Sequence, residues 1–392
     1  MRGPVAWWRS LEARPRSRAD GRLTDVFAIA TLAGIPLATV VRPMLPYRFS
    51  ADGLTIQLIA RGRYTLVQDP SYAVVSRLYA ALGLVGSPLL ASALGLAFGA
   101  WALWGALRGA RGRLTFPMVA LVAMYTVLLS IYLAQFSKDI WAVPVIAIAL
   151  FASRSIAGEV LVIAAIVGYA LTFRTYWFLV LLIYVMLRLA TWRRLDSRRV
   201  LVAIVAVVVG ATVLAPLVLG QEMQSFREIN NLGRATAVDS NTLIVPAQLG
   251  GNPVADSAEN LLTLASLVLP PPLAAHGSPL YLFYSLAIAF AWFVFARATF
   301  WGRGHLFDGS RPRPGEGTPR WALLLMAYVV TQGFFEPDYG SYLRHLTPFL
   351  PLMLATALHV PESPFLRPVK DEEGTGRLVR PWPPPQRTTS GS

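Results

Sequence analysis

Cysteine is absent from this chain of 392 residues, and charged residues are scarce. The lack of thiols excludes disulfides, thiol catalysis and cysteine-ligated metal sites. Asp, Glu, Lys and Arg make up 14% of the residues, whereas soluble domains carry about a quarter. The sequence has no Walker loop, no G-x-G-x-x-G turn and no H-E-x-x-H motif, and its four histidines are scattered. We therefore expect no metal site and no cofactor.

Apolar residues fill the chain instead. They make up 55% of it, and the mean hydropathy is +0.51. Apolar runs recur at lengths near the roughly 20 residues that a helix needs to cross a bilayer. Segments 200–219 and 279–296 do not alternate as barrel strands do, and a backbone in hydrocarbon must satisfy its amides within the segment. The sequence predicts an all-α, polytopic transmembrane helix bundle.

We place about ten spans in this bundle, with both termini in the cytoplasm. The fourth to sixth spans, 140–152, 156–172 and 176–191, are short for a full crossing. Polar turns that dip into the protein, or a locally thinned bilayer, would accommodate them. The predicted spans are 25–45, 86–107, 114–134, 140–152, 156–172, 176–191, 200–219, 279–297, 320–335 and 346–360.

The net charge of +14 invites a nucleic-acid interpretation, but the positions of the basic residues argue against it. Most of them flank apolar spans on one side, as the positive-inside rule expects of cytoplasmic segments. Six arginines within residues 1–24 precede the run 25–45, which is too long for a signal-peptide core and is predicted to be an uncleaved anchor. We expect no nucleic-acid partner.

The chain divides into a basic cytoplasmic tail (1–24), a transmembrane domain (25–360) and a cytoplasmic tail (361–392). The last is rich in Pro, Arg, Thr, Gly and Ser and is predicted to be disordered. Three outer loops, at 46–85, 220–278 and 336–345, are predicted. Within the first two, the apolar segments 72–85 and 261–273 are short enough to be interfacial helices, and the second could also be re-entrant. If either spans the membrane, the topology changes.

Polar residues concentrate on the predicted outer side. They lie in five separated segments: 48–69, 135–139, 173–177, 220–260 and 335–345. Since helices of one bundle bring their outer ends together, these segments are expected to converge. The sequence predicts a site that opens to the outer surface.

The segment 336–345 is the richest in chemistry. Glu336 or Asp338 could deprotonate a sugar hydroxyl, and Arg344 and His345 could hold the phosphates of a leaving group. The structural alternative is a turn closed by an ion pair between Asp338 and Arg344, with Ser341 capping the next helix.

The shorter outer segments add candidate substrate-binding residues. Arg174 has no acidic neighbour in sequence. Its guanidinium either binds a phosphate through two hydrogen bonds, with Tyr176 beside it, or extends to the lipid headgroups. Lys138 is the first lysine of the chain and could face an anionic lipid headgroup, with Asp139 next to it. Alternatively, Asp139 caps the following helix and the adjacent pair neutralises itself.

Two longer loops contribute one candidate each. Asp52 precedes the helical pattern 54–61. Its position in the first outer loop resembles that of the acidic residue of lipid-dependent glycosyltransferases, which is catalytic in those enzymes. A helix N-cap explains Asp52 equally well. Arg227 lies in 220–260, whose mix of charged and amide side chains suits binding of carbohydrate as well as any solvated loop.

Three of these pieces together resemble a family. The stretch Tyr-Leu-Ala-Gln-Phe-Ser-Lys-Asp at 132–139, then Phe-Arg-Thr-Tyr-Trp at 173–177, then Phe-Glu-Pro-Asp-Tyr-Gly-Ser-Tyr-Leu-Arg-His at 335–345 look like the Wzy-type and EpsG-like polysaccharide polymerases of bacteria. The likeness covers roughly residues 125–355. It implies a metal-independent glycosyltransferase on the outer face of the bacterial cytoplasmic membrane. Its substrate would be a polyprenyl-pyrophosphate-linked glycan, met among membrane lipids.

The resemblance also carries over site residues. Arg174 and Arg344 match the outer-loop arginines on which the family depends, and Lys138 and His345 match more loosely. A chain-length regulator and a flippase would fit such an enzyme as partners. Two other functions stay open: a single-sugar transferase of the GT-C type with a polyprenyl-phosphate donor, supported by Asp52, and a non-enzymatic transporter or flippase for lipid-linked glycans.

Overall fold

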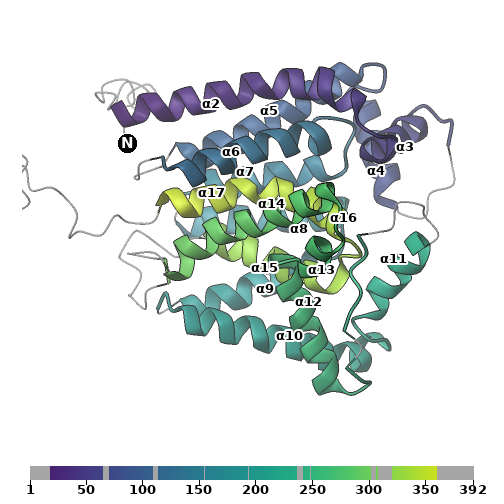
Figure 1. The fold of residues 1–392 in the computed structure, drawn as a ribbon, viewed down its shortest axis with the longest axis vertical. Coiled ribbons are helices and arrows are strands. Elements are labelled where there is room, and N and C mark those ends of the chain that lie inside the picture. Colours follow the sequence, from purple (N-terminus) through teal and green to yellow (C-terminus); the bar gives the residue numbers. More distant parts are fainter. Residues whose placement is uncertain are drawn as a thin grey trace, which may run out of the picture.

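The computed structural model describes residues 18–64, 70–108, 114–153, 155–192, 194–235, 242–247, 249–301, 306–307 and 320–359. Within these ranges the chain is all-helical and contains no strand, as the sequence predicts (Figure 1). The predicted C-terminal tail 361–392 lies outside the described residues, as does 1–17 of the N-terminal tail.

Helices that run roughly side by side form the body of the molecule (Figure 1). Each coincides with an apolar run that the sequence analysis singled out. Three of these helices begin at an N-cap whose side chain accepts a hydrogen bond from a backbone N–H group: Ser87, Ser155 and Asp196. Another signal is Gly220, which ends one helix with a φ of 69°. The helices are α2 (Arg18–Pro36), α5 (Pro88–Leu107), α6 (Phe116–Leu128), α7 (Ala142–Phe151), α8 (Ile156–Thr172), α9 (Trp177–Thr191), α10 (Ser197–Leu219), α14 (Pro279–Ala296), α15 (Arg320–Phe335) and α17 (Leu350–His359).

Five helical segments in the described ranges are long and apolar enough to cross a membrane: Arg22–Met44, Pro88–Leu107, Phe116–Leu133, Ser197–Val218 and Pro279–Phe300. Helices α7, α8, α9 and α15 are apolar but shorter, at 10, 17, 15 and 16 residues. The outside of the bundle is apolar too, because α10 exposes Leu201, Val202, Leu214, Leu217 and Val218. Exposed apolar side chains of this kind are typical of a membrane protein.

The centre of the bundle is occupied by α15 and α17. Every residue of α15 from Arg320 to Phe334 is buried, and in α17 the residues 350–356 and Leu358 are buried. A helix that is apolar on all sides belongs in an interior. Tyr328 of α15 stacks on Phe349 just before α17, with ring centroids 3.7 Å apart.

A close helix contact lies between α5 and the π-helical turn Leu129–Leu133 that extends α6. A Cβ atom at Gly95 would lie 2.7 Å from both the Ala134 Cα atom and the Leu133 carbonyl oxygen. Only glycine leaves room for that backbone. The contact fixes the start of the predicted polar segment 135–139.

Further helices gather at one end of the bundle, where Figure 1 places α3, α4, α11 and α16. They are α3 (Ala51–Ala60), α4 (Pro70–Ala81), α11 (Ser225–Ala235), α12 (Pro253–Val268), α13 (Pro271–Ala275) and α16 (Tyr339–Leu346). The predicted helical pattern 54–61 corresponds to α3, and the segment 72–85 to α4. The segment 261–273 is not one helix, because Leu269 and Pro270 separate α12 from α13.

Helices α3 and α4 form a hairpin that packs around a small apolar cluster of its own. Ile56, Val75 and Tyr79 are its fully buried members, together with Ala91 and Phe136. Trp141 and Phe173 pack against both this cluster and the large core of the bundle. The α3–α4 hairpin is therefore seated on the end of the bundle through shared apolar contacts.

Candidate functional site

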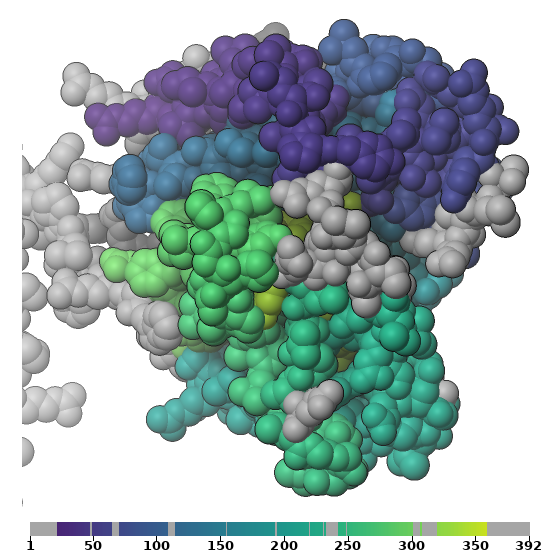
Figure 2. All heavy atoms as spheres, turned by 45° about the vertical axis from the view of Figure 1, so that its right-hand side comes forward, coloured from purple at the N-terminus to yellow at the C-terminus, as the bar shows by residue number. Residues whose placement is uncertain are grey.

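Side chains from four of the five predicted outer segments meet at this end. We call the group formed by Asp52, Lys138, Asp139, Arg174, Glu336, Arg344 and His345 the polar cluster. In Figure 2, which brings this end forward, yellow atoms of the C-terminal helices show in the depth between the indigo α3–α4 hairpin and the green and teal helices. The predicted convergence of these segments is thus present in the fold.

Asp139 is the centre of the polar cluster. It begins a short 3-10 turn ahead of α7, and its side chain is only 5% exposed. One carboxylate oxygen accepts a hydrogen bond from Arg174 Nη2 at 2.5 Å, and the other accepts one from Arg344 Nε at 2.6 Å. A buried carboxylate that bonds two guanidinium groups fixes both of them side by side. The alternatives of a self-neutralising Lys138–Asp139 pair and a snorkelling Arg174 do not describe this arrangement.

Arg344 also reaches a second carboxylate. Its Nη2 lies 2.5 Å from Asp52 Oδ2, and Tyr72 of α4 donates its hydroxyl to Asp52 Oδ1 at 2.6 Å. Burial opposes ionisation of Asp52, but Arg344, Lys138 and the Tyr72 hydrogen bond outweigh it and lower the pKa of Asp52 to about 2. Asp52 is therefore an anion at neutral pH. The N-cap of α3 is Ser50, so capping does not account for Asp52.

His345 and Glu336 form a dyad beside the arginines. His345 Nδ1 lies 2.8 Å from Glu336 Oε2, and His345 Nε2 lies 3.5 Å from Arg174 Nη2 and 3.7 Å from Asp139 Oδ1. If Nδ1 donates to the Glu336 carboxylate, Nε2 carries the lone pair that faces Arg174. Glu336 is 1% exposed and its other oxygen, Oε1, is buried without a hydrogen-bond partner. Glu336 can orient the imidazole but cannot itself meet a large substrate.

Lys138 and Tyr176 complete the surroundings. The Lys138 ammonium lies 4.2 Å from the centroid of the Tyr72 ring, which is within range of a cation–π contact. Arg174 Nη1 donates to the Tyr176 hydroxyl at 2.9 Å. The cluster therefore holds three cations and three carboxylates when His345 is neutral. Sequence reasoning missed Tyr72, although a hydroxyl-bearing residue on a predicted interfacial helix was a usable signal.

Asp338 has a structural position. It is the N-cap of α16, where its carboxylate accepts from the Ser341 backbone N–H at 2.7 Å and from the Ser341 hydroxyl at 2.8 Å. Its backbone also pairs with Leu243. The alternative of an Asp338–Arg344 ion pair is wrong, since Arg344 bonds Asp139 and Asp52, and the helix is capped by Asp338 and not by Ser341.

Arg227 lies apart from the polar cluster. It is fully buried in α11, and its guanidinium donates to the Gly333 carbonyl of α15 and to Thr263 Oγ1 of α12. Burial lowers its pKa to about 10, against the opposing effect of Glu336. Arg227 thus ties three helices together behind Glu336 and is not open to a ligand.

A second ionic group occupies the other end of α15. Glu159 of α8 accepts two hydrogen bonds from Arg188, at 3.0 and 3.1 Å, and one from the Tyr184 hydroxyl. Arg320 lies 3.7 Å from Glu159 and donates to the Ser153 carbonyl at 2.6 Å. These contacts join α8, α9 and α15. Because Glu159 is already bonded by Arg188 and Tyr184, this group is structural and is not a second candidate site.

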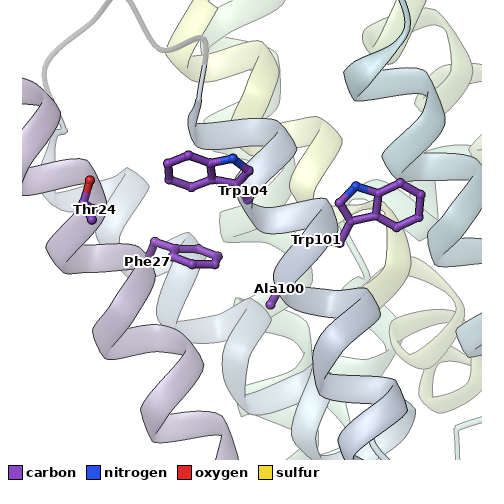
Figure 3. Close-up of a pocket in the computed structure, with 5 residues that line it drawn as sticks. All are labelled: Thr24, Phe27, Ala100, Trp101 and Trp104. Atoms are coloured by element: carbon purple, nitrogen blue, oxygen red, sulfur yellow. The ribbon is translucent and has the colours of Figure 1, made fainter. Parts of the chain in front are cut away.

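An open hollow of about 430 Å³ lies between α2 and α5, lined by Thr24, Phe27, Ala100, Trp101 and Trp104 (Figure 3). Its lining contains no acid, base or cation, so the hollow offers no catalytic chemistry. Among the residues that the structure describes, no group of three or more His, Cys, Asp or Glu side chains is arranged to hold a metal ion. The polar cluster is the candidate site.

Comparison with known proteins found no matching family model, no matching curated protein and no matching solved structure.

Proposed function

We propose that this protein is a metal-independent glycosyltransferase that joins polyprenyl-pyrophosphate-linked oligosaccharide units on the outer face of the bacterial cytoplasmic membrane. The observation that carries the proposal is the pair of arginines, Arg174 and Arg344, fixed side by side by Asp139. A pyrophosphate leaving group needs such fixed cations, because negative charge develops on it as the glycosidic bond breaks. The order of the motifs at 132–139, 173–177 and 335–345 adds to this support.

The proposed topology has about ten spans, with both termini in the cytoplasm and the polar cluster outside. Two observations favour it. The N-terminal end of α2 and the C-terminal end of α17 lie at the end of the bundle away from α16 (Figure 1). Arg188 and Arg320 lie at that same end, as positively charged cytoplasmic segments would.

The proposed reaction breaks the bond between the anomeric carbon of the donor glycan and the pyrophosphate oxygen. A new bond forms between that carbon and an acceptor hydroxyl oxygen, whose proton must go to a base. His345 Nε2 is the proposed acceptor of this proton, because Glu336 orients the ring through Nδ1. The polyprenyl pyrophosphate leaves with its charge held by Arg344, Arg174 and Lys138.

A second candidate is the single-sugar transferase that uses a polyprenyl-phosphate donor. The position of Asp52, in contact with Arg344 and in the segment after the first predicted span, favours it. A transporter is less well supported. Helices α5, α6, α7 and α14 contain no charged residue, so they offer no polar path through the bundle.

The test is the size profile of lipid-linked and surface glycans in cells that lack the gene. Complementation with the wild type should restore polymer, whereas Arg344→Ala should leave single repeat units to accumulate. Arg63→Ala is the matched control, because Arg63 is an exposed arginine after α3 with no place in the cluster. Truncated repeat units would indicate the single-sugar transferase. An unchanged profile in the deletion strain would contradict both enzymes for these glycans.

A further inference from the structure

The two carboxylates that bind Arg344 differ in burial. Asp139 holds Arg344 Nε from inside, and its side chain is 5% exposed. Asp52 holds Nη2 from outside, and its side chain is 32% exposed. The half-buried carboxylate can be replaced on Arg344 by another anion, while the fully buried carboxylate keeps the guanidinium in place.

The surroundings of Asp52 suit a phosphate. Tyr72 donates a hydroxyl to Asp52, Arg344 donates Nη2, and the Lys138 ammonium lies over the Tyr72 ring. Arg344 and Tyr72 would point their donors at any anion that took the place of the carboxylate. The charge of Lys138, which acts on Asp52, would attract the same anion. Burial and the Asp52 carboxylate raise the pKa of Tyr72, so its hydroxyl keeps the proton that it donates.

From this geometry we infer that the Asp52 carboxylate occupies the phosphate subsite of the protein, and that a lipid-linked pyrophosphate displaces it from Arg344 and Tyr72. The inference rests on the proposed function for the identity of the ligand. Asp52 is then a competitor for the subsite and not the base of the reaction.

Displacement of Asp52 would remove the ionic link between the α3–α4 hairpin and α16. The hairpin shares a small apolar cluster with Ala91 of α5 and with Phe136. Its remaining links are apolar contacts of Tyr79 with Phe136 and Trp141, and hydrogen bonds near the start of α7. Among these bonds, Tyr79 Oη donates to the Ser137 carbonyl at 3.2 Å. The proposed displacement would rotate the hairpin as a unit on these contacts.

Binding of farnesyl pyrophosphate to the purified full chain in detergent tests the subsite. Asp52→Asn keeps the shape of the side chain and removes the competing charge, so it should tighten binding on the order of tenfold, within the usual range for two coupled ligands. Arg344→Gln should abolish binding. Asp256→Asn is the matched control, because Asp256 is a carboxylate of α12 outside the cluster, and it should bind as the wild type does.

Inorganic pyrophosphate and farnesol separate the sources of affinity. Weak binding of inorganic pyrophosphate with the same gain in Asp52→Asn supports the subsite and assigns the remaining affinity to the lipid. If the wild type binds farnesyl pyrophosphate and Asp52→Asn binds it equally or less tightly, displacement is refuted while the proposed function stands. Two outcomes would contradict both the subsite and the proposed function. In one, Arg344→Gln binds farnesyl pyrophosphate as tightly as the wild type; in the other, neither the wild type nor any variant binds it.

The movement has a separate test that leaves Asp52 intact. Because the chain has no cysteine, spin labels can be attached at Ala81→Cys on α4 and Thr172→Cys on α8, both exposed. Farnesyl pyrophosphate should broaden the distribution of distances between the two labels or shift it to longer distances. The same labelled pair in Arg344→Gln should show no change in this distribution. An unchanged distance in a protein that binds the ligand would refute the opening of the hairpin.

Discussion

The substitution Asp139→Asn tests the central ion pair of the polar cluster. Asp139 is 5% exposed and bonds Arg174 and Arg344, which stay charged because the carboxylates around them outweigh the effect of burial on their pKa values. Removing one partner of a buried ion pair leaves uncompensated charge and costs about 3–5 kcal/mol. Asp52→Asn removes a carboxylate from the same Arg344, but at a half-buried position, where solvent screens the ion pair more and its loss costs about 1 kcal/mol.

The two variants are compared in purified protein, by unfolding in mixed micelles of increasing denaturing detergent, followed by far-ultraviolet circular dichroism. Asp139→Asn should lower the free energy of unfolding by about 2 kcal/mol or more relative to Asp52→Asn. Asp256→Asn should match the wild type. The reasoning is refuted if Asp52→Asn destabilises the protein as much as Asp139→Asn, because burial would then not determine the strength of these pairs.

Two further predictions concern packing and pH. Gly95→Val should destabilise the protein by about 1–3 kcal/mol in the same unfolding assay, because its Cβ atom would meet the backbone at Ala134. The control Gly168→Ala, where a Cβ atom meets nothing within 4 Å, should be neutral or stabilising, and equal effects at the two positions would contradict this account. The pKa of Asp52 is lowered from 3.8 to about 2, so its contribution to stability is complete above pH 4 and is lost as the pH falls toward 2. The stability difference between wild type and Asp52→Asn should stay constant from pH 8 to pH 5 and change between pH 4 and pH 2. A difference that stays constant down to pH 2 would show that folding does not shift the pKa of Asp52.

Helix positions could be predicted from sequence because apolar runs and capping residues are local signals. The runs at 86–107, 156–172 and 279–297 reappear as α5, α8 and α14 with nearly the same ends. The meeting of the polar segments followed from the same pattern, since alternating helix directions place their connections at two ends. The interruption between α12 and α13 was missed because apolar composition does not distinguish one helix from two.

The pairing of side chains could not be predicted, because it depends on how neighbouring helices are rotated and offset. Asp139 and Arg344 are 205 residues apart, and nothing local in the sequence indicates that they touch. Asp338 and Ser341 were assigned the wrong partners for a related reason: a carboxylate next to a helix start caps it more readily than it reaches an arginine two turns away. Arg227 looked like a loop residue, whereas tertiary contacts bury it.

The brevity of α7 determines how deep the chemistry would lie. Its 10 residues extend about 15 Å, half the roughly 30 Å spanned by the 20 residues of the neighbouring α5. In a bilayer, the end of α7 that carries Asp139 would therefore lie below the level at which longer helices emerge. A lipid phosphate could then contact Arg344 while its isoprenoid chain stays in hydrocarbon, so that the growing glycan would enter from water and its anchor would never leave the membrane.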